Sequence, residues 1–117
     1  MDFVKPKDIF WNDIKDLPSN SLVKYYLMSS YLYYELDVNV LSDSEFDSLC
    51  KILLKNFDDI KHMRKNLLDK DSLKASTGYT LKYPTVVKHL AIKWYNNYVV
   101  YINSLKRKKN VDWRIYK

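Results

Sequence analysis

The stretch that decides the fold is YLYYELDVNVLSDSEFD, residues 31–47, which contains the end of one helix, a short connector and the start of another. Ser42 followed by Glu45 is the capping-box pattern, in which each side chain binds the other residue's backbone N–H group. Leu41 and Phe46 have the spacing of a hydrophobic staple across the same helix start. A helix is therefore predicted to begin directly after Ser42.

Apolar residues on both sides of this stretch recur every three to four positions, which is typical of amphipathic helices. Upstream, a helix is predicted to run from Ser19 or Asn20, either of which can be its N-cap, to about Leu36. Downstream, the apolar face of the second helix continues to Ile60. Two helices joined by so short a connector are expected to pack antiparallel, as a helical hairpin.

The flanking segments also favour helices. Residues 10–17 predict a short lead-in helix, and Asp71 and Ser72 can cap one short turn. Pro84 can occupy the first turn of a long last helix that ends at Lys109, with Asn110 as its left-handed cap. The buried stripe of that helix is expected to contain Val87, Leu90, Ala91, Trp94, Tyr98, Tyr101, Ile102 and Leu105.

One glycine and three prolines in 117 residues leave few places for tight turns. We therefore expect an all-α fold, a small helical bundle of about four helices that contains the antiparallel hairpin. Residues 1–117 are expected to form a single helical domain, with the hairpin at 30–60 and the long C-terminal helix at 84–109.

Composition narrows the functional classes. Cys50 is the only cysteine, which excludes an intramolecular disulfide and favours a buried thiol. His62 and His89 are far apart in sequence, so no metal site is expected. Neither a signal peptide nor an apolar run of about 20 residues is present, which predicts a cytoplasmic protein without a membrane partner. Abundant Lys, Asn, Tyr and Ile with little Gly favour an AT-rich genome, and we interpret the chain as phage-encoded.

Charge is divided unevenly along the chain. Residues 1–58 hold 6 Lys and Arg against 10 Asp and Glu, a net charge of −4, whereas residues 59–117 hold 14 against 4, a net charge of +10. Such a basic half can bind nucleic-acid phosphates. The candidate phosphate contacts are Lys106, Arg107, Lys108, Lys109 and Arg114, with Trp113 or Tyr116 available to stack on a base. The alternative is a solvated helix end with a short aromatic anchor.

An aromatic pair, Tyr33-Tyr34, is followed by Leu36-Asp37 and by the helix start DSEFD at residues 43–47. Through these residues the segment from about 30 to 60 resembles the small N-terminal Ia domain of bacterial NAD-dependent DNA ligases. In that family the Ia domain is a helical hairpin that recognises the nicotinamide mononucleotide half of NAD. The resemblance covers about a quarter of the chain.

The resemblance implies a cofactor site for NAD or nicotinamide mononucleotide formed by Tyr33, Tyr34, Asp43, Phe46 and Asp47. Two positions depart from the family pattern, because Tyr34 stands where these ligases usually have His and Phe46 where they usually have Tyr. No K-x-D-G adenylation motif follows, so the lysine nucleophile of a ligase is missing. The chain is therefore expected not to be an enzyme, with no catalytic residues and no ability to ligate DNA alone.

These observations lead to three hypotheses. The first is a non-catalytic interaction protein that binds a protein partner through exposed tyrosines, as a ligase module supplied in trans or as an inhibitor of a host enzyme. The second is a small basic protein that binds DNA or RNA. The third is a module that binds NAD or nicotinamide mononucleotide. The oligomeric state stays open.

Overall fold

The computed structural model describes residues 9–62, 64–77 and 82–114, and side chains of the last helix as far as Lys106. Its α-helices are α1 (Trp11–Ile14), α2 (Ser19–Leu36), α3 (Asp43–Lys55), α4 (Lys70–Lys74) and α5 (Thr85–Arg114), with two 3-10 turns, η1 (Phe57–Asp59) and η2 (Lys65–Leu67). No strand occurs in the described residues. The predicted small all-α bundle with a helical hairpin is confirmed.

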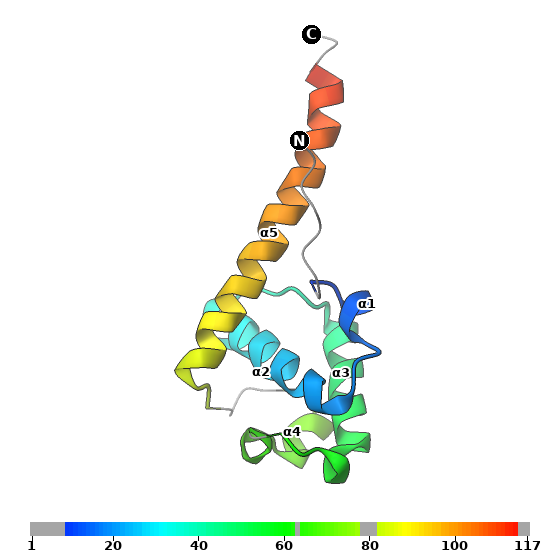
Figure 1. The fold of residues 1–117 in the computed structure, drawn as a ribbon, viewed down its shortest axis with the longest axis vertical. Helices are drawn as coiled ribbons and strands as arrows, with labels where there is room; N and C mark the ends of the chain where they lie inside the picture. The colour runs from blue at the N-terminus through cyan, green and yellow to red at the C-terminus, as the bar shows by residue number, and fades with distance from the viewer. Residues whose placement is uncertain (1–8, 63, 78–81, 115–117) are drawn as a thin grey trace.

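The helix α2 lies at the centre of the bundle and packs against both α3 and α5. Figure 1 shows α2 in the centre of the body with α3 to its right, α4 beneath them and α5 rising above them. Most of the middle of α2 is buried, including Leu22, Val23, Tyr26 and Leu27. So wide an apolar surface needs two neighbours, and α3 and α5 supply them.

The ends of α2 are set by backbone groups. Pro18 occupies the N-cap position, so the prediction that Ser19 or Asn20 caps the helix is wrong. The Asn20 side chain is used elsewhere, because its Oδ1 accepts a hydrogen bond of 2.8 Å from the backbone N–H of Lys61. At the other end Asp37 adopts a left-handed conformation with φ 56°, which terminates the helix.

The start of α3 confirms the predicted capping box. The Ser42 hydroxyl accepts a hydrogen bond of 3.2 Å from the Glu45 N–H group, and Glu45 Oε1 accepts one of 2.8 Å from the Ser42 N–H group. The predicted continuation to Ile60 is wrong, since the helix ends at Lys55. Asn56 Nδ2 binds the Ile52 carbonyl at 3.1 Å and so satisfies one of the free groups at the helix end.

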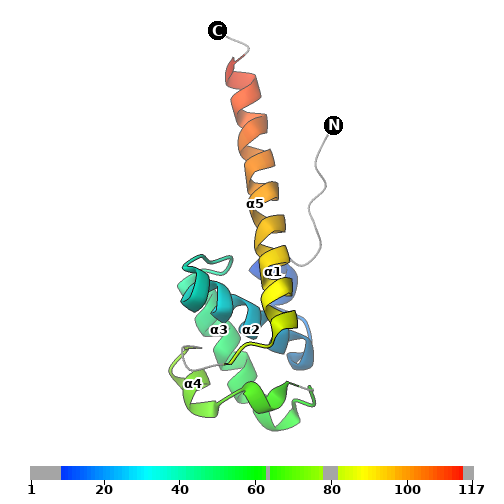
Figure 2. The same cartoon turned by 90° about the vertical axis from the view of Figure 1, so that its left-hand side faces the viewer.

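Asp69 caps α4, so the prediction that Asp71 or Ser72 caps this helix is wrong. Asp69 accepts hydrogen bonds from the N–H groups of Asp71 and Ser72, at 3.3 and 3.2 Å, so these two residues lie inside the helix rather than before it. The helix α4 then packs against α3, as Figure 2 also shows.

The first half of α5 attaches to the body through Trp94. The indole Nε1 of Trp94 donates a buried hydrogen bond of 3.1 Å to the Ile9 carbonyl, and its ring meets the Tyr25 ring edge-on at 5.5 Å. Of the predicted stripe, Val87, Ala91 and Trp94 are buried, and Tyr98, Tyr101 and Ile102 are partly buried. Leu90 and Leu105 are exposed by 44% and 40%, which corrects that part of the prediction.

The second half of α5 extends past the other helices (Figures 1 and 2). At a rise of about 1.5 Å per residue its 30 residues span about 45 Å, more than α2 can cover. The helix continues to Arg114, so the prediction that Asn110 ends it is wrong. No helix in the described part of the chain is long and apolar enough to cross a membrane.

We predict that Ser42→Ala lowers the free energy of unfolding by about 1 kcal/mol, because it leaves the Glu45 N–H group without its acceptor. Urea denaturation followed by circular dichroism measures this change. Ser48→Ala is the matched control, since this exposed hydroxyl binds only the Ser44 carbonyl four residues earlier within α3. An equal loss in the two variants would contradict the capping explanation.

Candidate functional site

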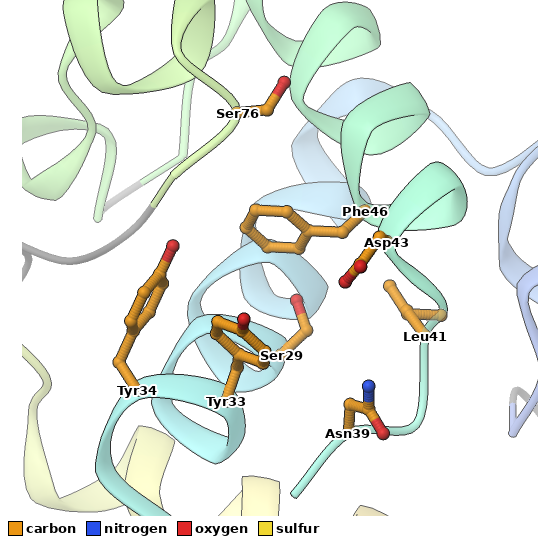
Figure 3. A pocket seen from close by; sticks show the side chains of 8 residues that line it. All are labelled: Ser29, Tyr33, Tyr34, Asn39, Leu41, Asp43, Phe46 and Ser76. Atoms are coloured by element: carbon orange, nitrogen blue, oxygen red, sulfur yellow. The ribbon is translucent and has the colours of Figure 1, made fainter. Parts of the chain in front are cut away.

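A pocket of about 260 Å³ lies where α2, the connector after it and the start of α3 meet the segment that follows α4. Figure 3 shows the side chains around it. Its lining residues are Ser29, Tyr33, Tyr34, Asn39, Leu41, Asp43, Phe46 and Ser76. Ser29 and Leu41 are buried and form its floor, whereas Tyr33, Asn39 and Asp43 are exposed and form its rim.

The pocket brings together four of the five residues that the resemblance nominates as a cofactor site. Tyr33 and Tyr34 come from the last turns of α2, and Asp43 and Phe46 come from the first turn of α3. The capping box fixes where α3 begins and therefore the directions in which the side chains of Asp43 and Phe46 point. Asp47 is the exception, since it is not one of the lining residues.

Three aromatic rings give the pocket its walls. The rings of Tyr33 and Tyr34 meet almost perpendicularly, with centroids 4.8 Å apart and an interplanar angle of 88°. Phe46 faces them from α3 (Figure 3) and stacks on the buried ring of Tyr26, at 5.7 Å and 23°. Because Phe46 is supported from behind, its position is set by the core of the protein.

The Ser76–Thr77 segment closes one side of the pocket through hydrogen bonds to both helices of the hairpin. The Tyr34 hydroxyl lies 2.7 Å from Thr77 Oγ1, and the Tyr26 hydroxyl donates to the Thr77 carbonyl at 2.6 Å. The Ser76 hydroxyl donates to Asp47. Ser76 has φ 53°, a left-handed conformation that costs a non-glycine residue about 1 kcal/mol, and these bonds hold it there.

Asp47 therefore stabilises the Ser76–Thr77 segment at the side of the pocket and does not line the pocket itself. Its carboxylate binds Lys51 at 2.8 Å as well as the Ser76 hydroxyl. These two hydrogen bonds, that of Lys51 first, lower the pKa of Asp47 below its ordinary value. The same pair raises the pKa of Lys51. Both side chains are partly exposed, so the pair is open to screening by salt.

Sequence reasoning missed four lining residues, for different reasons. Ser29 lies one turn before Tyr33 on α2, so helical spacing can find it. Asn39 and Leu41 belong to the connector between two nominated pairs, and their proximity in sequence is a usable signal. Ser76 has no such signal, because it is 29 residues from its partner Asp47.

The remaining predicted positions lie away from this pocket. Lys106 is exposed on α5, and the side chains of Arg107, Lys108, Lys109 and Arg114 lie outside the described residues, so a nucleic-acid contact there stays a prediction. Within the described part of the chain, no group of three or more His, Cys, Asp or Glu side chains is arranged to hold a metal ion. Cys50 is buried as expected, and burial raises the pKa of its thiol to about 12.

We predict that the Asp47 contacts make stability depend on acid pH. Because the pKa of Asp47 is lower in the folded protein, its contribution is present above the unfolded carboxyl pKa of about 4 and is lost as pH falls through the folded value. The free energy of unfolding of the parent should therefore decrease more between about pH 5 and 2 than that of Asp47→Asn. Equal pH slopes for the two proteins, measured by chemical denaturation, would rule out this role.

Comparison with known proteins does not place the chain in a family. It matches no protein-family model, and neither a curated protein nor a solved structure is significantly similar to it.

Proposed function

We propose that the chain is a non-catalytic binding module whose pocket takes the nicotinamide-bearing half of a nicotinamide nucleotide. The observation that carries this proposal is that Tyr33, Tyr34, Asp43 and Phe46 line one pocket between two helices. These residues were nominated together by the ligase resemblance. In the ligase Ia domain the corresponding positions serve nicotinamide mononucleotide recognition.

The size and walls of the pocket support a ligand of this kind. Its volume of about 260 Å³ is slightly below the range of about 300–1,000 Å³ that is typical of small-molecule sites. It therefore suits a ring with its sugar better than a complete dinucleotide. The perpendicular rings of Tyr33 and Tyr34, with Phe46 opposite, offer both faces and edges to a flat aromatic ring.

The lining residues also support binding rather than catalysis. The Ser76 hydroxyl, a potential nucleophile, is occupied by its hydrogen bond to Asp47. The Tyr34 hydroxyl contacts Thr77, and the Ser29 hydroxyl donates to the Tyr25 carbonyl at 2.6 Å. Both groups thus contribute to the architecture of the site.

We predict that nicotinamide mononucleotide binds the full chain and that Tyr33→Ala weakens binding about tenfold or more, since stacking of a base on an aromatic ring contributes about 1–3 kcal/mol. Isothermal titration calorimetry measures both affinities. Leu36→Ala is the matched control, because Leu36 is an exposed side chain of α2 that does not line the pocket. Absence of binding heat at millimolar concentration with every nicotinamide ligand, from NAD to nicotinamide itself, would refute the proposal.

A second candidate is the binding of a protein partner, and one observation favours it. Large apolar side chains of α5 are exposed by 40–48%, namely Val86, Leu90, Ile92, Val100 and Leu105. Val86 and Leu90 are one turn apart and therefore share a face of α5, which gives the first turns of this helix an exposed apolar surface that a partner can cover. We propose that α5, rather than the tyrosines of the pocket, contacts this partner.

This second candidate predicts that Val86→Lys together with Leu90→Lys, which change one face of α5, abolishes recovery of a stoichiometric protein from host lysate. The pair Lys88→Glu and Lys93→Glu, on the same helix, is the control for a general change of charge. Quantitative pull-down with the folded variants provides the measurement. Failure of the parent chain to recover any stoichiometric protein would exclude this candidate.

A further inference from the structure

The pocket has an acidic residue on its rim but no basic residue. Asp43 carries the only formal charge among the eight described lining residues. Its carboxylate is directed toward the space between Phe46 and Tyr33 (Figure 3). Asp43 makes neither an ion pair nor a side-chain hydrogen bond with another described residue, whereas Asp47, one turn later, is occupied by Lys51 and Ser76.

This distribution of charge disfavours a phosphate group. Protein phosphate sites combine Arg or Lys side chains with free backbone N–H groups, usually at a helix N-terminus. Here the N–H groups of Glu45 and Phe46 already bind Ser42, through its hydroxyl at 3.2 Å and its carbonyl at 2.9 Å. The Asp43 carboxylate itself occupies the positive end of the α3 dipole. A phosphate would therefore meet a like charge without a compensating cation.

The same features favour an organic cation. Faces of Tyr and Phe rings attract a positive charge through their quadrupoles, and rings arranged around a pocket are the usual binding site for quaternary nitrogen. Tyr33, Tyr34 and Phe46 provide such a set of rings, and Asp43 provides a counter-ion at its edge. Because Tyr34 is fixed by its contact with Thr77, at least one wall is positioned before a ligand arrives.

We propose that the pocket selects a flat aromatic cation without a phosphate group, such as a pyridinium nucleoside or base, with Asp43 as its counter-ion. This inference rests on the proposed function, because it names which member of the nicotinamide class the pocket prefers. It also assigns Asp43 the role of a specificity-determining residue.

The first test compares two ligands that differ only in the phosphate. Calorimetric titration of the full chain with nicotinamide riboside and with nicotinamide mononucleotide is expected to give about tenfold tighter binding of the riboside at low salt. The difference should narrow as salt is added, because the repulsion between phosphate and Asp43 is screened. Tighter binding of the mononucleotide would overturn the charge preference while leaving the proposed function intact.

The second test isolates the positive charge. The 1-methylnicotinamide cation is expected to bind about tenfold more tightly than neutral nicotinamide. Asp43→Asn should remove most of that difference by weakening the cation alone, and Asp43→Glu should restore part of it. Asp59→Asn, which removes an exposed carboxylate that does not line the pocket, should change neither affinity.

Two further results would overturn either the role of Asp43 or the proposed function. An equal loss of cation and neutral ligand in Asp43→Asn, with circular dichroism showing a folded variant, would overturn the role of Asp43 as counter-ion. Absence of binding by all four ligands would instead refute the proposed function itself. The two failures are therefore distinguishable.

Discussion

The buried side chain of Tyr26 is the element on which the pocket depends. Its ring stacks on Phe46 and its hydroxyl donates to the Thr77 carbonyl, so one residue of α2 contacts both α3 and the Ser76–Thr77 segment. Burial raises the pKa of the Tyr26 hydroxyl, which therefore stays protonated and remains a donor at any ordinary pH. A buried donor or acceptor left without its partner costs about 1–3 kcal/mol, so this bond strongly disfavours alternative positions of the segment.

Two adjacent residues of α2 have different structural roles. Tyr26 supports the pocket, whereas Tyr25 contacts Trp94 and so attaches α5. A successive pair on a helix points about 100° apart, which allows one helix to serve α3 and α5 simultaneously. The ligand pocket and the projecting helix are therefore joined through the rigid interior of the bundle, without sharing lining residues.

The sequence predicted the elements that local patterns specify. The capping box at Ser42 and Glu45 located the start of α3, and the apolar spacing located α2 and the first half of α5. Helix ends were less predictable, because the Asn56 and Asp69 side chains bind nearby backbone groups where an apolar pattern alone suggests a different boundary.

The residues of the candidate site also differ in how well the sequence predicts them. Tyr33, Tyr34, Asp43 and Phe46 come from one continuous stretch, so a short-range pattern could nominate all four. The role of Asp47 could not be predicted, because its partner Ser76 is distant in sequence and becomes a neighbour only through the packing of α4 on α3. Exposure of Leu105 likewise depends on how far the body of the bundle extends along α5, which periodicity does not encode. Leu90 is exposed because it lies to one side of the face that buries Val87, Ala91 and Trp94.

The hydrogen bonds of the Ser76–Thr77 segment also imply an order of assembly. They join residues 29, 43 and 51 positions apart, whereas the α2–α3 hairpin is closed by a connector of a few residues. Because closing a longer loop costs more chain entropy, the hairpin is expected to form first and the segment to dock on it later. The rings of the pocket thus come together early in folding, and the wall that encloses them is added afterwards.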